Sequence, residues 1–131
     1  MKPQMNTDEH RLEVNKITEK IIAASYKVSN VLGCGFLEKV YENAMVVELH
    51  RAGLRVVQQA VVKVRHEDVI VGDYVADLLV EGQVVVELKA VSALDDIHAA
   101  QCLNYLKATG LHVALLINFG KPKVEVKRFV L

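Results

Sequence analysis

Three charged residues interrupt a strongly apolar part of the chain, and together they could do metal-dependent chemistry. Glu87 and Lys89 lie in the segment 84–91, which is otherwise entirely apolar, and Asp77 lies in the apolar run before it. A run that is apolar on both faces is typical of a central, doubly covered strand. An ionised group is tolerated there only beside a counter-charge, a dense hydrogen-bond network or a metal. Since Glu87 and Lys89 are two residues apart, their side chains should point to one face.

The turn at 81–83 decides whether Asp77 and Glu87 meet. If these residues form a three-residue loop, Val80 pairs with Val84 and Asp77 lies opposite Glu87. Like charges in such a cross-strand pair destabilise a sheet unless a cation lies between them, so this register predicts a divalent-ion site. A two-residue turn, which is more common, would place the carboxylates on opposite faces. We favour the longer loop because two separately buried carboxylates would cost more than a less common turn.

Length and composition limit the function classes. The chain has 131 residues, a net charge of +0 and 52% hydrophobic residues, with 5% aromatics and no tryptophan. We expect one domain over 1–131, with residues 1–9 as a flexible N-terminal tail. A protein that grips duplex DNA through broad phosphate contacts is usually basic, so nucleic acid would have to bind a local patch. Scarce aromatics weaken the case for a base-stacking platform.

The cysteines and the apolar segments indicate the compartment. Cys34 and Cys102 are too few and too unpatterned for a disulfide scaffold or a zinc site, so reduced thiols are the simplest interpretation. The first ten residues lack an apolar signal core, and no uncharged run reaches the roughly 18 residues that a membrane span needs. We therefore expect a soluble, cytoplasmic protein without a membrane partner.

The order of elements predicts an α/β fold of the mixed α+β kind. We expect a first helix capped by Asn6 or Thr7 and ended by the glycines at 33 and 35, and further helices over 37–51 and 94–109. Strands are expected over 54–66, 68–80, 84–91, 112–118 and 123–130. Two helices, a meander, a crossover helix and two more strands predict a mixed central β-sheet flanked by helices on both faces.

The third predicted helix adds an amide and a phenol. Gln101 and Tyr105 are i and i+4, so they share one helical face with Ile97 and Ala108. If this face is inward, both polar groups need partners, and the charged end of the preceding strand could supply them. Gln101 could equally bridge ordinary backbone groups.

Taken in order, these residues resemble a known constellation. Ala76-Asp77, Glu87-Leu88-Lys89 and Gln101-x-x-x-Tyr105 resemble the active site of the PD-(D/E)XK nuclease superfamily, particularly its exonuclease-type branch with a Q-x-x-x-Y helix. Two further motifs resemble the small bacterial proteins called the GxxExxY family: Gly35-Phe36-Leu37-Glu38-Lys39-Val40-Tyr41 and Asn118-Phe119-Gly120. Ala76 stands where the superfamily's name has proline, a position that varies. The resemblance extends from about residue 17 to the last residue.

The resemblance implies a restriction-endonuclease-like core with a site for Mg²⁺ or Mn²⁺. Asp77 and Glu87 would hold the ion, the backbone carbonyl of Leu88 would be a further ligand, and Glu38 from the second helix an additional one. Such oxygen ligands suit Mg²⁺, which keeps several waters and substrate oxygens. The ion would activate water and neutralise charge on the phosphoryl oxygens.

The same resemblance implies catalytic roles and a nucleic-acid partner. Lys89 would orient or help deprotonate the attacking water, while Gln101 and Tyr105 would position the lysine or a phosphate oxygen. The expected function is a Mg²⁺-dependent nuclease that hydrolyses phosphodiester bonds, with DNA favoured over RNA. A homodimer could enlarge the binding surface, using an exposed edge strand or the first helix as its interface.

Other interpretations stay open. A catalytically silent protein could keep the fold and work as a nucleic-acid- or protein-binding regulatory module, which neutral charge and small size support. A small-molecule phosphatase or nucleotide hydrolase would be a third class, but the chain has no Gly-rich phosphate loop. Among single residues, we expect Glu42 on the surface, Tyr41 in the core and His98 in a structural role.

Overall fold

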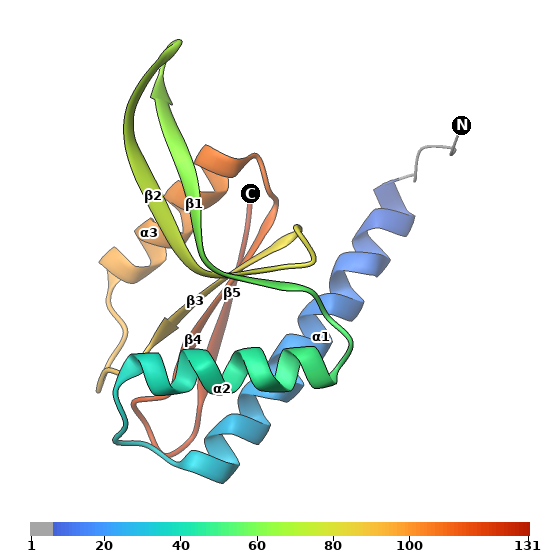
Figure 1. The fold of residues 1–131 in the computed structure, drawn as a ribbon, viewed down its shortest axis with the longest axis vertical. Coiled ribbons are helices and arrows are strands. Elements are labelled where there is room, and N and C mark those ends of the chain that lie inside the picture. Colours follow the sequence, from blue (N-terminus) through green and yellow to red (C-terminus); the bar gives the residue numbers. More distant parts are fainter. Residues whose placement is uncertain (1–6) are drawn as a thin grey trace.

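A five-stranded sheet carries helices on both faces in the computed structural model, which describes residues 7–131 (Figure 1). The helices are α1 (Thr7–Leu32), α2 (Glu38–Arg51) and α3 (Asp96–Thr109). The strands are β1 (Val56–His66), β2 (Val69–Val80), β3 (Val84–Lys89), β4 (Val113–Asn118) and β5 (Glu125–Val130). They are ordered β1-β2-β3-β4-β5, and only β3 and β4 pair in parallel. The mixed sheet with helices on both faces is therefore confirmed.

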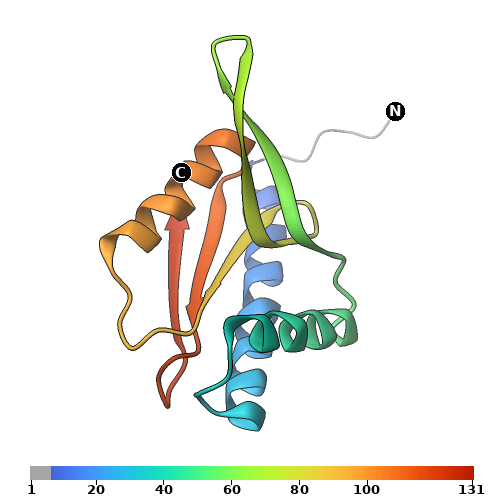
Figure 2. The same ribbon diagram turned by 60° about the vertical axis from the view of Figure 1, so that its left-hand side comes forward.

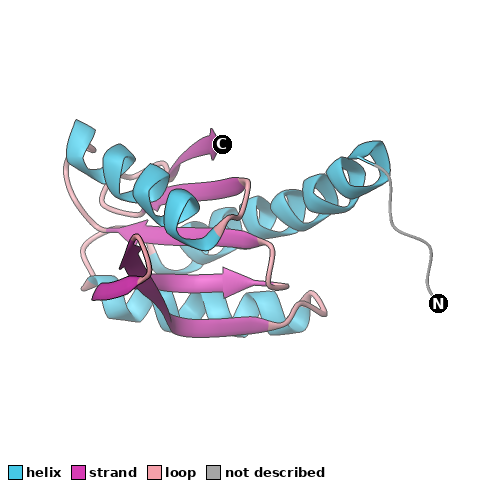
Figure 3. Cartoon of the chain, turned by 90° about the horizontal axis from the view of Figure 1, so that it is seen from above, coloured by secondary structure: helices cyan, strands magenta, loops and turns pink. Residues whose placement is uncertain are grey.

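Two apolar cores lie on opposite sides of the sheet. One core joins α1 and α2 to the sheet, and the other joins α3 to it, so α2 and α3 are seen on opposite faces in Figure 3. β3 alternates between them, since Val86 belongs to the first core and Val85 to the second. Glu87 pairs with Leu116, a residue of the core beside α3. Glu87 therefore points to the face that α3 covers.

The start of α1 agrees with the predicted helix but differs from the predicted tail. The helix begins at Thr7, and Asp8 and Glu9 lie in its first turn, where negative charge favours the helix dipole. The flexible tail predicted over 1–9 is therefore wrong for residues 7–9. The remainder of that tail and the proposed Asn6 cap lie outside the described residues. None of the helices described from residue 7 onward combines the length and apolarity that a membrane span requires.

The hairpin between β2 and β3 has the predicted register. Residues 81–83 form the loop, and Val80 pairs with Val84. Glu81 and the glycine after it both adopt positive φ angles, 54° and 63°. The Glu81 carboxylate accepts hydrogen bonds from the backbone N–H and the guanidinium of Arg55, at 2.7 and 3.2 Å. The three-residue loop is confirmed, and it directs Asp77 and Glu87 toward each other.

The hairpin of β1 and β2 twists near its middle, so that the side chains of one face change from one core to the other. Leu78 lies in the core beside α1 and α2, whereas Ala76, two residues earlier, lies in the core beside α3. Residues two apart in a regular strand share a face, so the ribbon must rotate at Asp77. Gln59, which faces Asp77 across the pair, has a left-handed φ of 51° that provides the rotation. The outer half of the hairpin then projects beyond the sheet (Figure 2).

A buried asparagine clamps the loop that leaves β3. The Asn118 amide bonds the backbone N–H and carbonyl of Val91 at 3.0 and 2.9 Å, and also bonds Glu125 at 3.0 Å. The backbone N–H of Gly120 donates to the same side chain at 3.0 Å. A Cβ added at Gly120 would lie only 2.1 Å from the Val91 carbonyl oxygen. The loop that carries the chain from Lys89 to α3 is thus fixed by close backbone contact.

We predict that Gly120→Ala lowers the free energy of unfolding by about 3 kcal/mol, because a backbone atom cannot give way as a flexible side chain can. Urea denaturation monitored by circular dichroism measures the change. Gly72→Ala is the matched control, since Gly72 has no positive φ and an added Cβ there meets nothing within 4 Å. Equal denaturation midpoints for the two variants would contradict the clamp.

Candidate metal and active site

The three charged residues predicted to form a site lie together in one cleft. Asp77, Glu87 and Lys89 all line a cavity of about 530 Å³ between the hairpin and α3, and Gln101 lines it from the helix. β2 and β3 bring the two carboxylates together, because they are next in register beyond the pair of Leu78 with Val86. The cleft therefore combines two acids, one ammonium and one amide.

Glu87 is the most perturbed carboxyl of the cleft. Its side chain is 9% exposed, and Oε1 has no hydrogen-bond partner among residues 7–131. Burial, together with the charge of Asp77, raises the pKa of Glu87 from 4.5 to about 8, while the charge of Lys89 opposes the change. A buried carboxyl oxygen without a partner, next to a second carboxylate, favours a bound cation.

Asp77 is anchored at the edge of the cleft. Its Oδ2 accepts a 2.8 Å bond from the backbone N–H of Leu88, and Oδ1 accepts a 3.4 Å bond from the Gln59 amide. The N–H and C=O of one residue in an extended strand point to the same neighbour. The Leu88 carbonyl is therefore directed to the side on which Asp77 lies.

These donors fit Mg²⁺ or Mn²⁺ better than zinc. Over residues 7–131, no group of three histidine, cysteine or carboxylate side chains could hold an ion by itself. Zinc sites usually need at least three such side chains. Mg²⁺ is typically held by one or two carboxylates, with water and phosphate oxygens as its other ligands. Two carboxylates, one of them with a free buried oxygen, suit that second kind of site.

Glu38 reaches the same region from the start of α2. Burial raises the pKa of this half-buried carboxyl; Lys89 lowers it, and Asp77 and Glu42 raise it. The charges of Lys89 and Asp77 therefore both act on the Glu38 carboxyl. Glu38 itself does not line the cavity.

Tyr41 fixes the segment that carries Glu38. The buried Tyr41 hydroxyl donates to the Gly33 carbonyl at 2.7 Å and accepts from the Phe36 backbone N–H at 3.3 Å. Its ring stacks on Phe119, with the centroids 4.7 Å apart. Tyr41 is therefore a core residue, as predicted, and it ties the start of α2 to the end of β4.

α3 presents a different face from the predicted one. The inward stripe is wrong at Ile97 and Gln101, which are exposed, because the buried face carries Cys102, Tyr105 and Leu106 instead. Gln101 lies at the rim of the cleft. The Tyr105 hydroxyl donates to the Ala60 carbonyl at 3.2 Å, so it joins α3 to β1 and does not line the cleft.

His98 has a structural role at the start of α3. Its Nδ1 accepts a 3.2 Å bond from the backbone N–H of Asp95, while the Asp95 carboxylate accepts from the Ile97 N–H at 2.9 Å. These reciprocal bonds form a capping box. The structural role predicted for His98 is confirmed.

A buried hydrogen-bond network lies beside the site and was not predicted from the sequence. Glu42 is only 3% exposed, so its predicted surface position is wrong. Its carboxylate accepts three hydrogen bonds of 2.7 Å each, from Lys39, Gln58 and Gln59. The base of the hairpin crosses α2 here, and Gln59 extends the network to Asp77. The only local signal was a pair of adjacent glutamines among the apolar residues at the start of this strand.

We predict that Glu42→Ala lowers the free energy of unfolding by about 2 kcal/mol more than Glu48→Ala does. Glu42 belongs to a buried hydrogen-bond network, whose loss leaves partners unsatisfied. Glu48 lies on the same helix and pairs with the exposed Lys27 and Arg51, and surface ion pairs contribute little. Urea denaturation of both variants checks this. Equal losses would show that the network adds nothing beyond a surface pair.

The comparisons with known proteins add one family and one structure. A family model described as the PD-(D/E)XK nuclease superfamily matches residues 15–129. No curated protein matches the chain. Among solved structures, an alkaline exonuclease (LHK-Exo) from Laribacter hongkongensis is similar, with a TM-score of 0.49 and 11% sequence identity, over 86% of this chain and 81% of that one.

Proposed function

Since this chain belongs to the PD-(D/E)XK nuclease superfamily, we propose that it is a Mg²⁺- or Mn²⁺-dependent nuclease that hydrolyses phosphodiester bonds, with DNA as the favoured substrate. One observation carries this proposal: the buried Glu87 Oε1, which has no hydrogen-bond partner among residues 7–131, lies in the same cleft as Asp77 and Lys89. A purely structural ion pair would leave no such orphaned oxygen, whereas a metal ion would satisfy it.

Asp77, Glu87 and the Leu88 carbonyl are the proposed ligands, with Glu38 as an additional one from α2. When bound, a divalent ion supplies a Lewis acid for the phosphate and lowers the pKa of water. Glu87 must lose its proton to bind a cation. Because its pKa is about 8, the carboxyl keeps its proton at neutral pH until the ion binds. Ion binding at this site should therefore release a proton at neutral pH.

Lys89 and Gln101 are proposed to act on the substrate. The Lys89 ammonium offers three donors on the same strand face as Glu87, and it can orient the attacking water or contact the scissile phosphate. The Gln101 amide faces the cleft from α3 and can donate to a phosphate oxygen. Tyr105 supports these groups indirectly, because its bond to Ala60 holds α3 against the hairpin.

The proposal is tested by incubating the protein with end-labelled single-stranded DNA, duplex DNA and RNA, in Mg²⁺, in Mn²⁺ and in EDTA. Cleavage that needs the ion and is absent from Lys89→Ala supports the enzyme. Equal background in both proteins would contradict it and would favour a catalytically silent binding module. A homodimer stays a prediction, and size-exclusion chromatography with light scattering decides it.

A further inference from the structure

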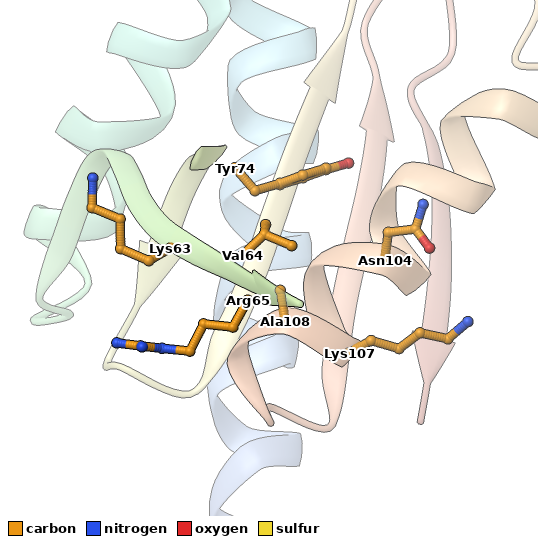
Figure 4. Close-up of a pocket in the computed structure, with 7 residues that line it drawn as sticks. All are labelled: Lys63, Val64, Arg65, Tyr74, Asn104, Lys107 and Ala108. Atoms are coloured by element: carbon orange, nitrogen blue, oxygen red, sulfur yellow. The ribbon is translucent and has the colours of Figure 1, made fainter. Parts of the chain in front are cut away.

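A second cleft continues from the first one. It has a volume of about 580 Å³ and lies between the outer half of the β1–β2 hairpin and α3 (Figure 4). Tyr74 and Asn104 line both cavities, so the two clefts meet at these side chains. No residue of the proposed metal site lines the second cleft. It therefore offers a separate surface that a bound substrate would reach directly from the site.

The second cleft has an apolar floor and cationic rims. Lys63 and Arg65 of β1 extend to one side in Figure 4, and Lys107 of α3 extends to the other, with Val64 and Ala108 between them. Among residues 7–131, Asp73 pairs with the Lys63 ammonium at 2.7 Å, whereas no carboxylate pairs with the other two cations. Two positive charges without a carboxylate partner, Arg65 and Lys107, thus lie on either side of Val64 and Ala108, although the whole chain is neutral.

Tyr74 lies at the junction of the two clefts, and its ring is fixed by two contacts. Its hydroxyl donates to the Gln101 carbonyl at 2.9 Å, and its ring packs edge-on against Tyr105 with the centroids 5.3 Å apart. The ring is therefore held in place before any ligand binds. An aromatic ring fixed beside an apolar strip is a surface on which a nucleobase can stack.

We propose that this second cleft binds the single-stranded segment of the substrate next to the bond that is cut. A strand that crosses the floor places a base against Tyr74 and Val64, and its flanking phosphates near Arg65 and Lys107. Cavities of this volume hold small ligands, on the order of one or two nucleotides, and a duplex is too wide to enter. This inference rests on the proposed nuclease function, which supplies the polymer.

The charges around the cleft limit the contact to a short segment. Glu67 and Asp68 form the tip of the hairpin beyond Arg65, and both are exposed. Carboxylates repel a polyanion, so a strand gains nothing by continuing along the hairpin. The basic surface therefore suits a few nucleotides rather than a long phosphate track, in agreement with the neutral net charge.

Binding of a labelled oligothymidine in EDTA, followed by fluorescence anisotropy at several salt concentrations, tests the cleft without cleavage. Each cation that contacts a phosphate of a single strand contributes about 0.7 to the slope of log affinity against log salt. The double variant Arg65→Ala, Lys107→Ala should therefore lose about 1.4 from this slope and bind about ten-fold or more weakly at 0.1 M salt. Duplex affinity should change much less.

The matched control is the double variant Lys16→Ala, Lys123→Ala, which removes the same charge from exposed positions on α1 and between β4 and β5. It should bind like wild type. Equal affinities for the two double variants, or an equal loss for duplex and single strand, would overturn the proposal.

Tyr74 gives an independent readout. Tyr74→Phe should keep single-strand affinity, whereas Tyr74→Leu should weaken it about five-fold or more, since the leucine cannot stack. Circular dichroism first verifies that both variants fold, and equal affinities of the folded variants would contradict stacking.

If wild type never cuts nucleic acid but these losses of binding are observed, the cleft stands and the nuclease proposal fails. If wild type cuts nucleic acid, but the double variant Arg65→Ala, Lys107→Ala has unchanged binding and KM, only the cleft proposal fails.

Discussion

Replacing Lys89 with alanine is expected to reduce metal-dependent cleavage by at least about 100-fold. The ammonium shares one strand face with Glu87 and lines the cleft that both carboxylates line. A positioned group that handles a proton in the transition state typically contributes 100- to 10,000-fold in rate, and a charge aimed at the phosphate adds electrostatic stabilisation. Single-turnover cleavage of end-labelled DNA with saturating Mg²⁺ measures the loss.

Two further variants define what the Lys89 result means. Lys127→Ala removes an exposed lysine of β5, and its cleavage rate should stay within two-fold of wild type, as an estimate for a surface charge remote from the chemistry. Lys89→Arg keeps the charge on a guanidinium, which stays protonated and cannot act as a base. Recovery of the rate in Lys89→Arg would assign charge stabilisation to Lys89 rather than proton transfer. Wild-type activity in Lys89→Ala would remove Lys89 from the mechanism.

Replacing Glu87 with glutamine is expected to stabilise the metal-free protein at high pH while removing its response to Mg²⁺. The pKa of Glu87 is 4.5 ordinarily and about 8 in the fold. Between these values the folded state holds more protons than the unfolded state, so the free energy of unfolding falls as pH rises and the contribution is lost above pH 8. Each unit of pKa difference is about 1.4 kcal/mol, so the total change amounts to several kcal/mol.

The measurement is urea denaturation in EDTA across the range from pH 4 to pH 9. Glu87→Gln should match wild type at the acidic end and be more stable at the alkaline end. Glu48→Gln is the control, because the Lys27 ammonium holds the pKa of Glu48 below its ordinary value. Parallel stability curves for wild type and Glu87→Gln would contradict the buried, proton-retaining carboxyl.

Millimolar Mg²⁺ provides the second half of this prediction. A ligand that binds only the folded state increases the free energy of unfolding by RT ln(1 + [L]/Kd) and thereby raises the melting temperature. Wild type should show this rise, and neither Glu87→Gln nor the double variant Asp77→Asn, Glu87→Gln should show it. Equal melting temperatures of wild type with and without the ion would count against a metal at this site.

The main fold could be predicted from sequence because its signals are local. Helical spacing and capping residues marked the three helices, and the apolar run of 84–91 marked a central strand that is buried on both faces. The register of Asp77 with Glu87 followed from the energetic cost of separating two buried carboxylates, not from turn statistics. The restriction-endonuclease-like core and the superfamily are confirmed, while the narrower GxxExxY family and the roles of the site residues stay predictions.

The missed features depend on contacts between distant segments. Glu42 is buried because Gln58 and Gln59 cross above it, 16 and 17 residues later in the chain. That crossing needs the left-handed backbone of Gln59, which sequence does not reveal because residues other than glycine rarely adopt it. The face of α3 was misjudged for a similar reason. Helical spacing fixes which residues share a side, but only the neighbouring strands decide which side is covered.

The limited pairing between β2 and β3 has a mechanical consequence. The ladder covers only Leu78, Leu79 and Val80 of β2, so the ribbon beyond Ala76 is tied to the remainder of the molecule by side chains alone. The hydroxyls of Tyr74 and Tyr105 supply two of those ties. The hairpin and α3 therefore share the sheet as a common base, and the hairpin can shift relative to β3 without breaking a backbone hydrogen bond of the β2–β3 ladder.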